Sequence, residues 1–285
     1  KSLIFFLPLS SYRMNIQSFC RLNLPRQSLF FSLTRSFCEK KPSIVPILRE
    51  IRAKTGAGVM DCKRTLEKNG MDVEKTIAEL MKKARSSQGR DGRVTSAGWI
   101  GFAAENSKGV LADLHTETDF VAKNDQFKSL SDKIAKSSLL IEKTDQNYTI
   151  DVDEAIQMKL DGGVTVSEKI SELIFTMGEA IKLNRVEGMQ LKEGVVNGYV
   201  HGGRIGVLVG LQGGEPTEEL ARDIAIHIAA CSPKVISPED VSEGDDIKSG
   251  DILVQQDYIH DESITVGDVL KKHGSPTVFM NILRR

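Results

Sequence analysis

The chain has 285 residues, enough for one or two domains, and 40% of them are hydrophobic. Its 38 basic and 39 acidic residues give a formal net charge of −1, and no basic stripe with interleaved aromatic residues is present. This argues against a nucleic-acid partner bound through its phosphates. The four cysteines form no C-x-x-C pair and no Cys/His cluster, so the sequence predicts neither a zinc site nor a disulfide framework.

Residues 1–37 differ in composition from the rest of the chain. They lack acidic residues, are rich in Ser, Phe and Leu, and contain these basic residues: Lys1, Arg13, Arg21, Arg26 and Arg35. This composition is typical of an organelle transit peptide, and the stretch "RSFC" resembles a mitochondrial processing site. A disordered tail is the alternative. The apolar run "LIFFLPL" is short and interrupted by Pro8, so it predicts neither a membrane span nor a secretory signal.

Residues 42–85 contain three short helical patterns. The first, "SIVPILREIRAKTG", can be capped by Ser43 and ends in glycine, while the third, "DVEKTIAELMKKA", starts at a capping Asp72. The second, "VMDCKRTLEKNG", places three residues on one face: Val59, Cys62 and Leu66. Three amphipathic helices in this short span predict a compact bundle. The polar, glycine-bearing residues 86–96 that follow predict a linker.

Strand patterns begin after the linker. "GWIGFAAENSKGVLADLHTE" contains two alternating runs, which predict a β-hairpin that turns at residues 106–109. A helix follows, with apolar residues on one face at Phe127, Leu130 and Ile134. "GYVHGGRIGVLVGLQGG" predicts a second hairpin, again followed by a helix, "ELARDIAIHIAA". A hairpin and a helix, twice, predict an α+β fold with two duplicated subdomains at 97–191 and 192–285.

Two further helices and a last strand complete the pattern. The capping box Thr165-x-x-Glu168 opens a helix. Its expected core face contains Ile170, Leu173, Ile174, Met177 and Ile181. Near the end of the chain, "TVGDVLKKHG" predicts a helix and "TVFMNILRR" predicts a strand.

The sequence contains none of the common catalytic or phosphate-binding motifs. It has no G-x-x-x-x-G-K-[ST] loop, no G-x-S-x-G elbow and no H-E-x-x-H pair. The five histidines are scattered, and His227 falls on an apolar helical face, where a core histidine is the default interpretation. The lack of a nucleophile with its base and acid argues against an enzyme.

The stretch "HTETDFVAKNDQF", residues 115–127, joins a strand pattern to a helix pattern. It has no hydrophobic period of its own, yet it carries Asp119 beside Phe120. One interpretation is that the ring packs under its own helix and the carboxylate caps that helix. The other is that both side chains are exposed to contact a partner, because a ring offers buried area with few rotors and a carboxylate offers a directional contact.

Five ordered blocks resemble the elongation factor Ts family. They are "TGAGVMDCKRTLEKNGMDVEKTIAEL", "TETDFVAKNDQF", "GYVHGGRIGVLVGL", "DIAIHIAACSP" and "SITVGDVLKKHG", and the resemblance covers residues 44–285. It implies a guanine-nucleotide exchange factor without covalent chemistry, cofactor or metal. The implied partner is elongation factor Tu in its GDP and nucleotide-free forms. Residues 42–85 resemble a UBA-like (ubiquitin-associated) module. Together with residues 1–37, the resemblance implies the mitochondrial member of the family, which would act in the matrix.

The resemblance also implies which residues contact the partner. Phe120 would wedge between helices of the partner's G domain, and Asp119 would reach a neighbouring polar group. Together they would displace the elements that position Mg²⁺. Further residues match contact positions of the family: Met60, Ile205, Gly206 and His227. For each of these four, ordinary packing within its own element is the alternative.

The chain departs from the family in two places. Many members carry a coiled-coil arm where this chain has only the short segment 242–252, so we expect that arm to be trimmed. Ala180 stands where the family usually shows Asn. The alternative function is a non-catalytic interaction protein that binds its partners through the UBA-like module.

Overall fold

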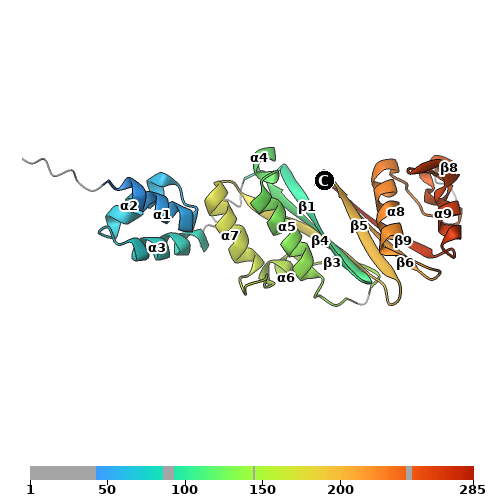
Figure 1. The fold of residues 1–285 in the computed structure, drawn as a ribbon, viewed down its shortest axis with the longest axis horizontal. Helices are drawn as coiled ribbons and strands as arrows, with labels where there is room; N and C mark the ends of the chain where they lie inside the picture. The colour runs from blue at the N-terminus through green and yellow to red at the C-terminus, as the bar shows by residue number, and fades with distance from the viewer. Residues whose placement is uncertain (1–42, 86–92, 144, 242–245) are drawn as a thin grey trace, which may run out of the picture. The chain divides into compact units, whose positions relative to one another are not determined.

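The computed structural model describes residues 43–85, 93–143, 145–241 and 246–285. The predicted transit peptide at 1–37, most of the predicted linker and part of the trimmed-arm segment lie outside the described residues. Within the described part of the chain, no helix is long and apolar enough to cross a membrane. The described elements form a mixed α+β fold with antiparallel sheets, which confirms the predicted class (Figure 1).

Three helices form the predicted bundle at the start of the described residues: α1 (Val45–Thr55), α2 (Val59–Lys68) and α3 (Val73–Arg85). Their amphipathic faces meet in one small core, because each helix alone is too short to be stable in water. The fully buried members of this core are Ile51, Ala57, Cys62, Leu66 and Leu80.

The ends of these helices follow the sequence in part. α1 ends where Gly56 takes a φ of 68°, and Asp72 caps α3 by accepting a backbone N–H at 3.0 Å. The cap expected at Ser43 is wrong, because Ile44 precedes the helix with helical backbone angles and makes no side-chain cap bond. Val59 was expected on the core face, but it is 48% exposed at the first position of α2.

The first sheet has the strand order β1-β2-β4-β3, and all neighbours are antiparallel. Its strands are β1 (Ala97–Glu105), β2 (Lys108–Thr116), β3 (Asn147–Ile150) and β4 (Ile181–Gln190). The hairpin turns on only Asn106 and Ser107, because Glu105 already pairs with Lys108. The longer turn predicted at 106–109 is therefore wrong. Asn106 takes the left-handed backbone, with a φ of 53°, that this tight turn favours.

Helices accompany this sheet in the chain: α4 (Asp119–Ala122), α5 (Asp125–Ser138), α6 (Val152–Gln157) and α7 (Val166–Met177). The predicted core face of α5 is confirmed, since these residues are buried: Phe127, Leu130 and Ile134. The capping box of Thr165 and Glu168 opens α7 as predicted. Ile181 does not lie on the core face of α7, because Gly178 ends that helix with a φ of 81° and Ile181 begins β4.

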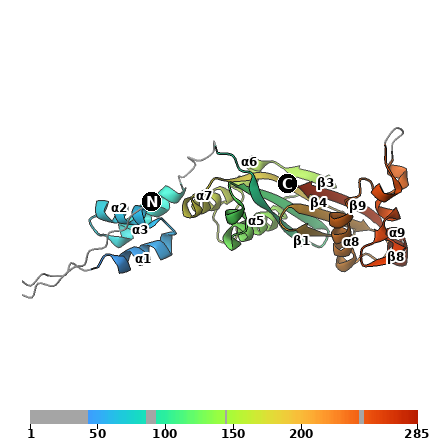
Figure 2. The same cartoon turned by 90° about the horizontal axis from the view of Figure 1, so that it is seen from above.

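The second sheet has the order β5-β6-β9 and is also antiparallel. Its strands are β5 (Val195–His201), β6 (Ile205–Gln212) and β9 (Thr277–Arg284). Helix α8 (Glu218–Cys231) lies against this sheet (Figure 2), and its buried residues share a core with the strands. Between α8 and β9 lie short elements: 3₁₀ helices Pro238–Asp240, Ser249–Asp251 and Leu253–Gln255, strands β7 (Asp257–Tyr258) and β8 (Asp261–Thr265), and α9 (Val266–Lys272). In both parts of the chain a β-hairpin is followed by a helix, but the duplication of two subdomains stays a prediction.

A third core cluster joins the two sheets. Its buried members include Ile100, Leu111, Met189, Leu208 and Leu283. Gly206 of β6 lies so close to the first sheet that an added Cβ would be 2.9 Å from Leu111 and 3.0 Å from Ile100. Glycine at this position therefore lets the sheets approach each other.

Candidate functional site

The single helical turn α4 presents a large aromatic side chain to solvent. Phe120 is 89% exposed, the highest value among the large hydrophobic residues that the structure describes. The next two residues, Val121 and Ala122, are buried and anchor the turn. The interpretation in which the ring packs under its own helix is therefore wrong. A ring held outside its own core is available to a partner.

Asp119, the first residue of α4, is also exposed, with 57% of its side chain accessible. It does not cap the helix, because Thr118 has that role and its Oγ1 accepts from Val121 N at 3.5 Å. The Asp119 carboxylate lies 3.7 Å from Arg204 Nη2 and 4.0 Å from Lys123 Nζ. Exposed ion pairs contribute little to stability, so the carboxylate can exchange these neighbours for a group on a partner.

The turn between β5 and β6, which contains Arg204, is fixed against β1. Gly203 has a φ of 70°, and a Cβ at this position would lie 2.2 Å from the Trp99 ring, so glycine is required for the turn to rest on that ring. Ile100 N also donates to Gly203 O at 3.0 Å. The turn therefore holds Arg204 beside Asp119.

The two predicted contact residues in β6 occupy different environments. Ile205 follows Arg204 directly and is half-buried against the core of the second sheet. Gly206 is buried between the sheets, which favours the packing role that was its alternative. The structure thus brings Asp119 together with the β5–β6 turn, while the contact roles of Ile205 and Gly206 stay predictions.

Met60, the second residue of α2, is 59% exposed and so does not belong to the core of the helical bundle. Val59 beside it is 48% exposed, which makes a small apolar pair at the start of this helix. Such an exposed pair suits a contact with another protein. The predicted contact role of Met60 is compatible with this exposure and stays a prediction.

His227 in α8 is fully buried, which favours the core histidine that was its alternative, while its contact role stays a prediction. Its Nε2 lies 2.9 Å from Gln256 Oε1, and its Nδ1 accepts from Ile259 N at 3.3 Å. The ring stacks on Tyr258 with centroids 6.2 Å apart. Burial holds the pKa of His227 below its ordinary value, which favours the neutral ring. His227 is a core histidine, because the apolar face of α8 packs on the second sheet.

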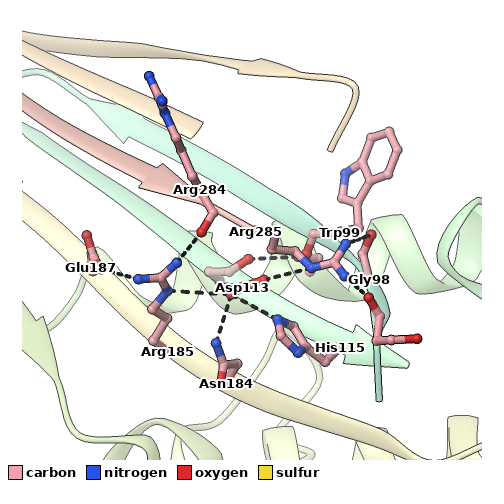
Figure 3. A network of polar contacts seen from close by, with 12 residues as sticks. Gly98, Trp99, Asp113, His115, Asn184, Arg185, Glu187, Arg284 and Arg285 are labelled. Atoms are coloured by element: carbon pink, nitrogen blue, oxygen red, sulfur yellow. Dashed lines mark hydrogen bonds and ion pairs between the residues drawn. The ribbon is translucent and has the colours of Figure 1, made fainter. Parts of the chain in front are cut away.

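A buried polar network adjoins the site, centred on Asp113 of β2, whose side chain is only 1% exposed (Figure 3). Four groups surround its carboxylate: His115 Nε2 at 3.0 Å, Asn184 Nδ2 at 3.0 Å, Arg185 Nε at 3.5 Å and Arg285 Nε at 3.5 Å. Burial raises the pKa of Asp113, but the hydrogen bonds from His115 and Asn184 and the nearby charges outweigh it. The pKa of Asp113 therefore lies below its ordinary value, and the carboxylate is ionised.

Arg285 connects this network to the β5–β6 turn. Its backbone N donates to Arg204 O at 3.0 Å. Its guanidinium donates to Gly98 O at 2.8 Å (Figure 3). It also donates to Ser96 O at 2.8 Å. The residue after β9 is thereby bonded to the start of β1 and to the turn that holds Arg204.

Two carboxylates that the sequence analysis missed hold the segment leading into α4. Glu179 accepts from Thr116 Oγ1 at 3.1 Å, from Thr118 N at 3.0 Å and from Thr118 Oγ1 at 2.7 Å. In return, Glu117 accepts from Ala180 N at 2.6 Å. These partners are 61 to 63 residues apart in the sequence, so no local pattern reveals them.

The chemistry of the site is that of a binding surface. Phe120, Asp119 and Arg204 offer an exposed ring, a carboxylate and a guanidinium. Among the residues that the structure describes, no group of three or more His, Cys, Asp or Glu side chains could hold a metal ion. A ring flanked by opposite charges suits another protein, because the ring can fill an apolar pocket while the charges set orientation.

Comparison with known proteins identifies related chains. A family model described as "Elongation factor TS" matches residues 117–249, a range that starts two residues before α4. The chain is 34% identical over 267 residues to Elongation factor Ts of Idiomarina loihiensis, covering 81% of this chain and 87% of that protein. It is 36% identical over 198 residues to Elongation factor Ts of Alcanivorax borkumensis, covering 68% and 66%. It is 33% identical over 266 residues to Elongation factor Ts of Halothermothrix orenii, covering 80% and 87%.

Proposed function

The chain belongs to the elongation factor Ts family, and from this premise we propose that it promotes the release of GDP from elongation factor Tu during translation. The names of its relatives support a role as a translation elongation factor. The proposed reaction makes and breaks no covalent bond in this chain, since one bound nucleotide is exchanged for another. The proposed partner is elongation factor Tu in its GDP-bound and nucleotide-free forms.

The observation that carries this proposal is the exposure of Phe120 on a turn that its own fold holds in place. The ring can enter a partner without first leaving a core, so insertion requires little rearrangement of this chain. Asp119 and Arg204 make the flanking polar contacts. In the partner, the inserted ring displaces the elements that position Mg²⁺ beside the GDP phosphates. Because Mg²⁺ neutralises phosphate charge, its displacement weakens the binding of GDP.

The proposed exchange is a coupling between two ligands of one partner. If the chain binds the nucleotide-free partner more tightly than the GDP form, GDP must weaken the binding of the chain by the same factor. A thousandfold coupling corresponds to about 4 kcal/mol of differential binding free energy. One aromatic anchor and several charged contacts can supply such a difference.

The chain in this proposal is the mitochondrial form, and it acts in the matrix. The acid-free, arginine- and serine-bearing composition of residues 1–37 supports this assignment. Incubation of the full chain with energised mitochondria tests it. Uptake with cleavage close to residue 37 is the expected result, and a chain that stays uncleaved outside the organelle would contradict it.

Release of a fluorescent GDP from elongation factor Tu tests the proposed function. A substoichiometric amount of the chain should accelerate release, and Asp119→Ala with Phe120→Ala should remove most of the acceleration. A matched control is Asp161→Ala with Leu140→Ala, because these two residues are also exposed but do not lie on α4. No acceleration by the unmodified chain, or equal acceleration by both double variants, would reject the proposal.

A further inference from the structure

We propose that Glu179 is a positioning residue for nucleotide exchange: its carboxylate locks the Thr116–Thr118 segment and thereby aims Phe120 at the partner. This inference rests on the proposed function, since it assigns how that same site is presented. Glu179 lies between α7 and β4, and it does not need to touch the partner to act. It would act through the backbone that carries the ring.

Glu179 forms three hydrogen bonds with the segment that precedes α4. Its Oε1 accepts from Thr118 Oγ1, and its Oε2 accepts from both Thr118 N and Thr116 Oγ1. All three partners act as donors, so a carboxylate, which only accepts, satisfies them together. Hydrogen bonds to an ionised acceptor are stronger than those between neutral groups. The chain is thus held at Thr116 and Thr118, immediately before α4.

The Thr118 hydroxyl connects Glu179 to the helix that bears Phe120. The Thr118 hydroxyl donates its only proton to Glu179 at 2.7 Å, and its oxygen accepts from Val121 N at 3.5 Å. The carboxylate therefore fixes the rotation of the hydroxyl so that a lone pair faces the first turn of α4. Val121 directly follows Phe120, so this cap sets the direction in which the ring leaves the surface.

The segment after β2 and the segment before β4 hold each other. Thr116 is the last residue of β2, and it pairs with Ile181, the first residue of β4. Beyond this pair the strands end, and the side chains of Glu179 and Glu117 continue the connection in opposite directions. Glu117 accepts from Ala180 N at 2.6 Å, and Ala180 is only 1% exposed. The segment after β2 therefore remains anchored although it is no longer part of the sheet.

An exposed ring needs such support because its own core does not orient it. Most aromatic side chains are oriented by the core around them, but Phe120 is 89% exposed. Its direction is set by the backbone of a helix of only 4 residues. A short helix of this kind frays unless its cap is held. Holding the turn before binding reduces the ordering that the interface would otherwise require.

The test measures GDP release and local hydrogen exchange in the full chain. The variants are Glu179→Ala and Glu179→Gln, with Glu172→Ala as the matched control on α7, because the Glu172 carboxylate pairs with Lys169 at the surface. Glu179→Ala should slow catalysed GDP release roughly tenfold and raise deuterium uptake in residues 116–124, and Glu179→Gln should do so less. Glu172→Ala should change neither.

A second pair of variants covers the case in which Glu179→Ala does not fold. Thr118→Ser keeps the hydroxyl, whereas Thr118→Val removes it with little change in shape. We expect normal GDP release for Thr118→Ser and slowed release for Thr118→Val. Equal release rates for these two variants would overturn the proposed route through the hydroxyl.

The Phe120→Ala background separates positioning from general stability. If Glu179 acts through the ring, Glu179→Ala adds no further loss of GDP release once Phe120 is absent. An equal further loss would overturn the inference. Normal release by Glu179→Ala together with slow release by Phe120→Ala would overturn it while the proposed function stands. Normal release by both variants would mean that the proposed function itself fails.

Discussion

Arg204 Nη2 lies 3.7 Å from Asp119 Oδ2, although 85 residues separate the two in the sequence. The β5–β6 turn and the α4 turn therefore meet beside the exposed ring of Phe120. Arg285 binds the backbone of Arg204 and also faces the buried Asp113. The surface that the proposal assigns to the partner thus rests on a buried charge network that joins β2, β4 and the residue after β9.

Replacement of Asp113 by Asn should destabilise the protein strongly. Asn keeps the size of the side chain but removes the buried negative charge that faces Arg285 and Arg185, although Arg185 keeps its pair with Glu187. We expect a loss of about 3 kcal/mol in the free energy of unfolding, measured by urea denaturation. The matched control is Asp161→Asn, because Asp161 has an exposed side chain. A loss no larger than that of the control would show that the network does not hold the strands together.

Acidification should weaken the fold through His227. Burial lowers the pKa of this imidazole in the folded state, whereas the unfolded chain titrates near the ordinary value of 6.5. The stability contributed by the neutral ring is therefore complete above about pH 6.5 and declines as the pH falls below it. An NMR titration of the His227 ring should give a midpoint below 6.5. A midpoint at or above 6.5 would contradict its assignment as a buried core histidine.

Addition of one methyl group at Gly206 should force the sheets apart. The new Cβ in Gly206→Ala would lie 2.9 Å from Leu111 and 3.0 Å from Ile100, which is closer than ordinary van der Waals contact. We expect a loss of about 2 kcal/mol in the free energy of unfolding. Gly250→Ala is the matched control, because no atom lies within 4 Å of its added Cβ. Similar urea midpoints for the two variants would exclude a packing role for Gly206.

Local patterns predicted most elements of the fold, and long-range contacts account for the exceptions. The capping box of Thr165 and Glu168 and the apolar face of α5 depend on residues three or four positions apart, so the sequence displays them. Ile181 was assigned to the wrong element because it continues the helical spacing, and Gly178 ends the helix first. The Asn106–Ser107 turn is shorter than expected because pairing extends to Lys108.

In the candidate site, too, local features could be predicted from the sequence and long-range contacts could not. The neighbouring carboxylate and ring of Asp119 and Phe120 indicated a candidate contact site on this turn. The sequence left open whether the ring was buried. Its exposure depends on how α4 docks, which no local pattern contains. Glu179 escaped prediction because its partners lie at least 61 residues away. For His227 the resemblance implied a contact and the apolar helical face indicated the core, and the ring is buried in the described fold.

The rate of GDP release at saturating concentrations of the chain tests the central claim most directly. Phe120→Ala is compared with Leu140→Ala, which removes an equally exposed apolar side chain at 82% exposure outside α4. Loss of a central aromatic anchor commonly costs about 2 kcal/mol, so Phe120→Ala should lower the maximal release rate about thirtyfold. Leu140→Ala should leave it unchanged. Equal maximal rates for the two variants would contradict the account, because the exposed ring would then contribute nothing to the expulsion of GDP.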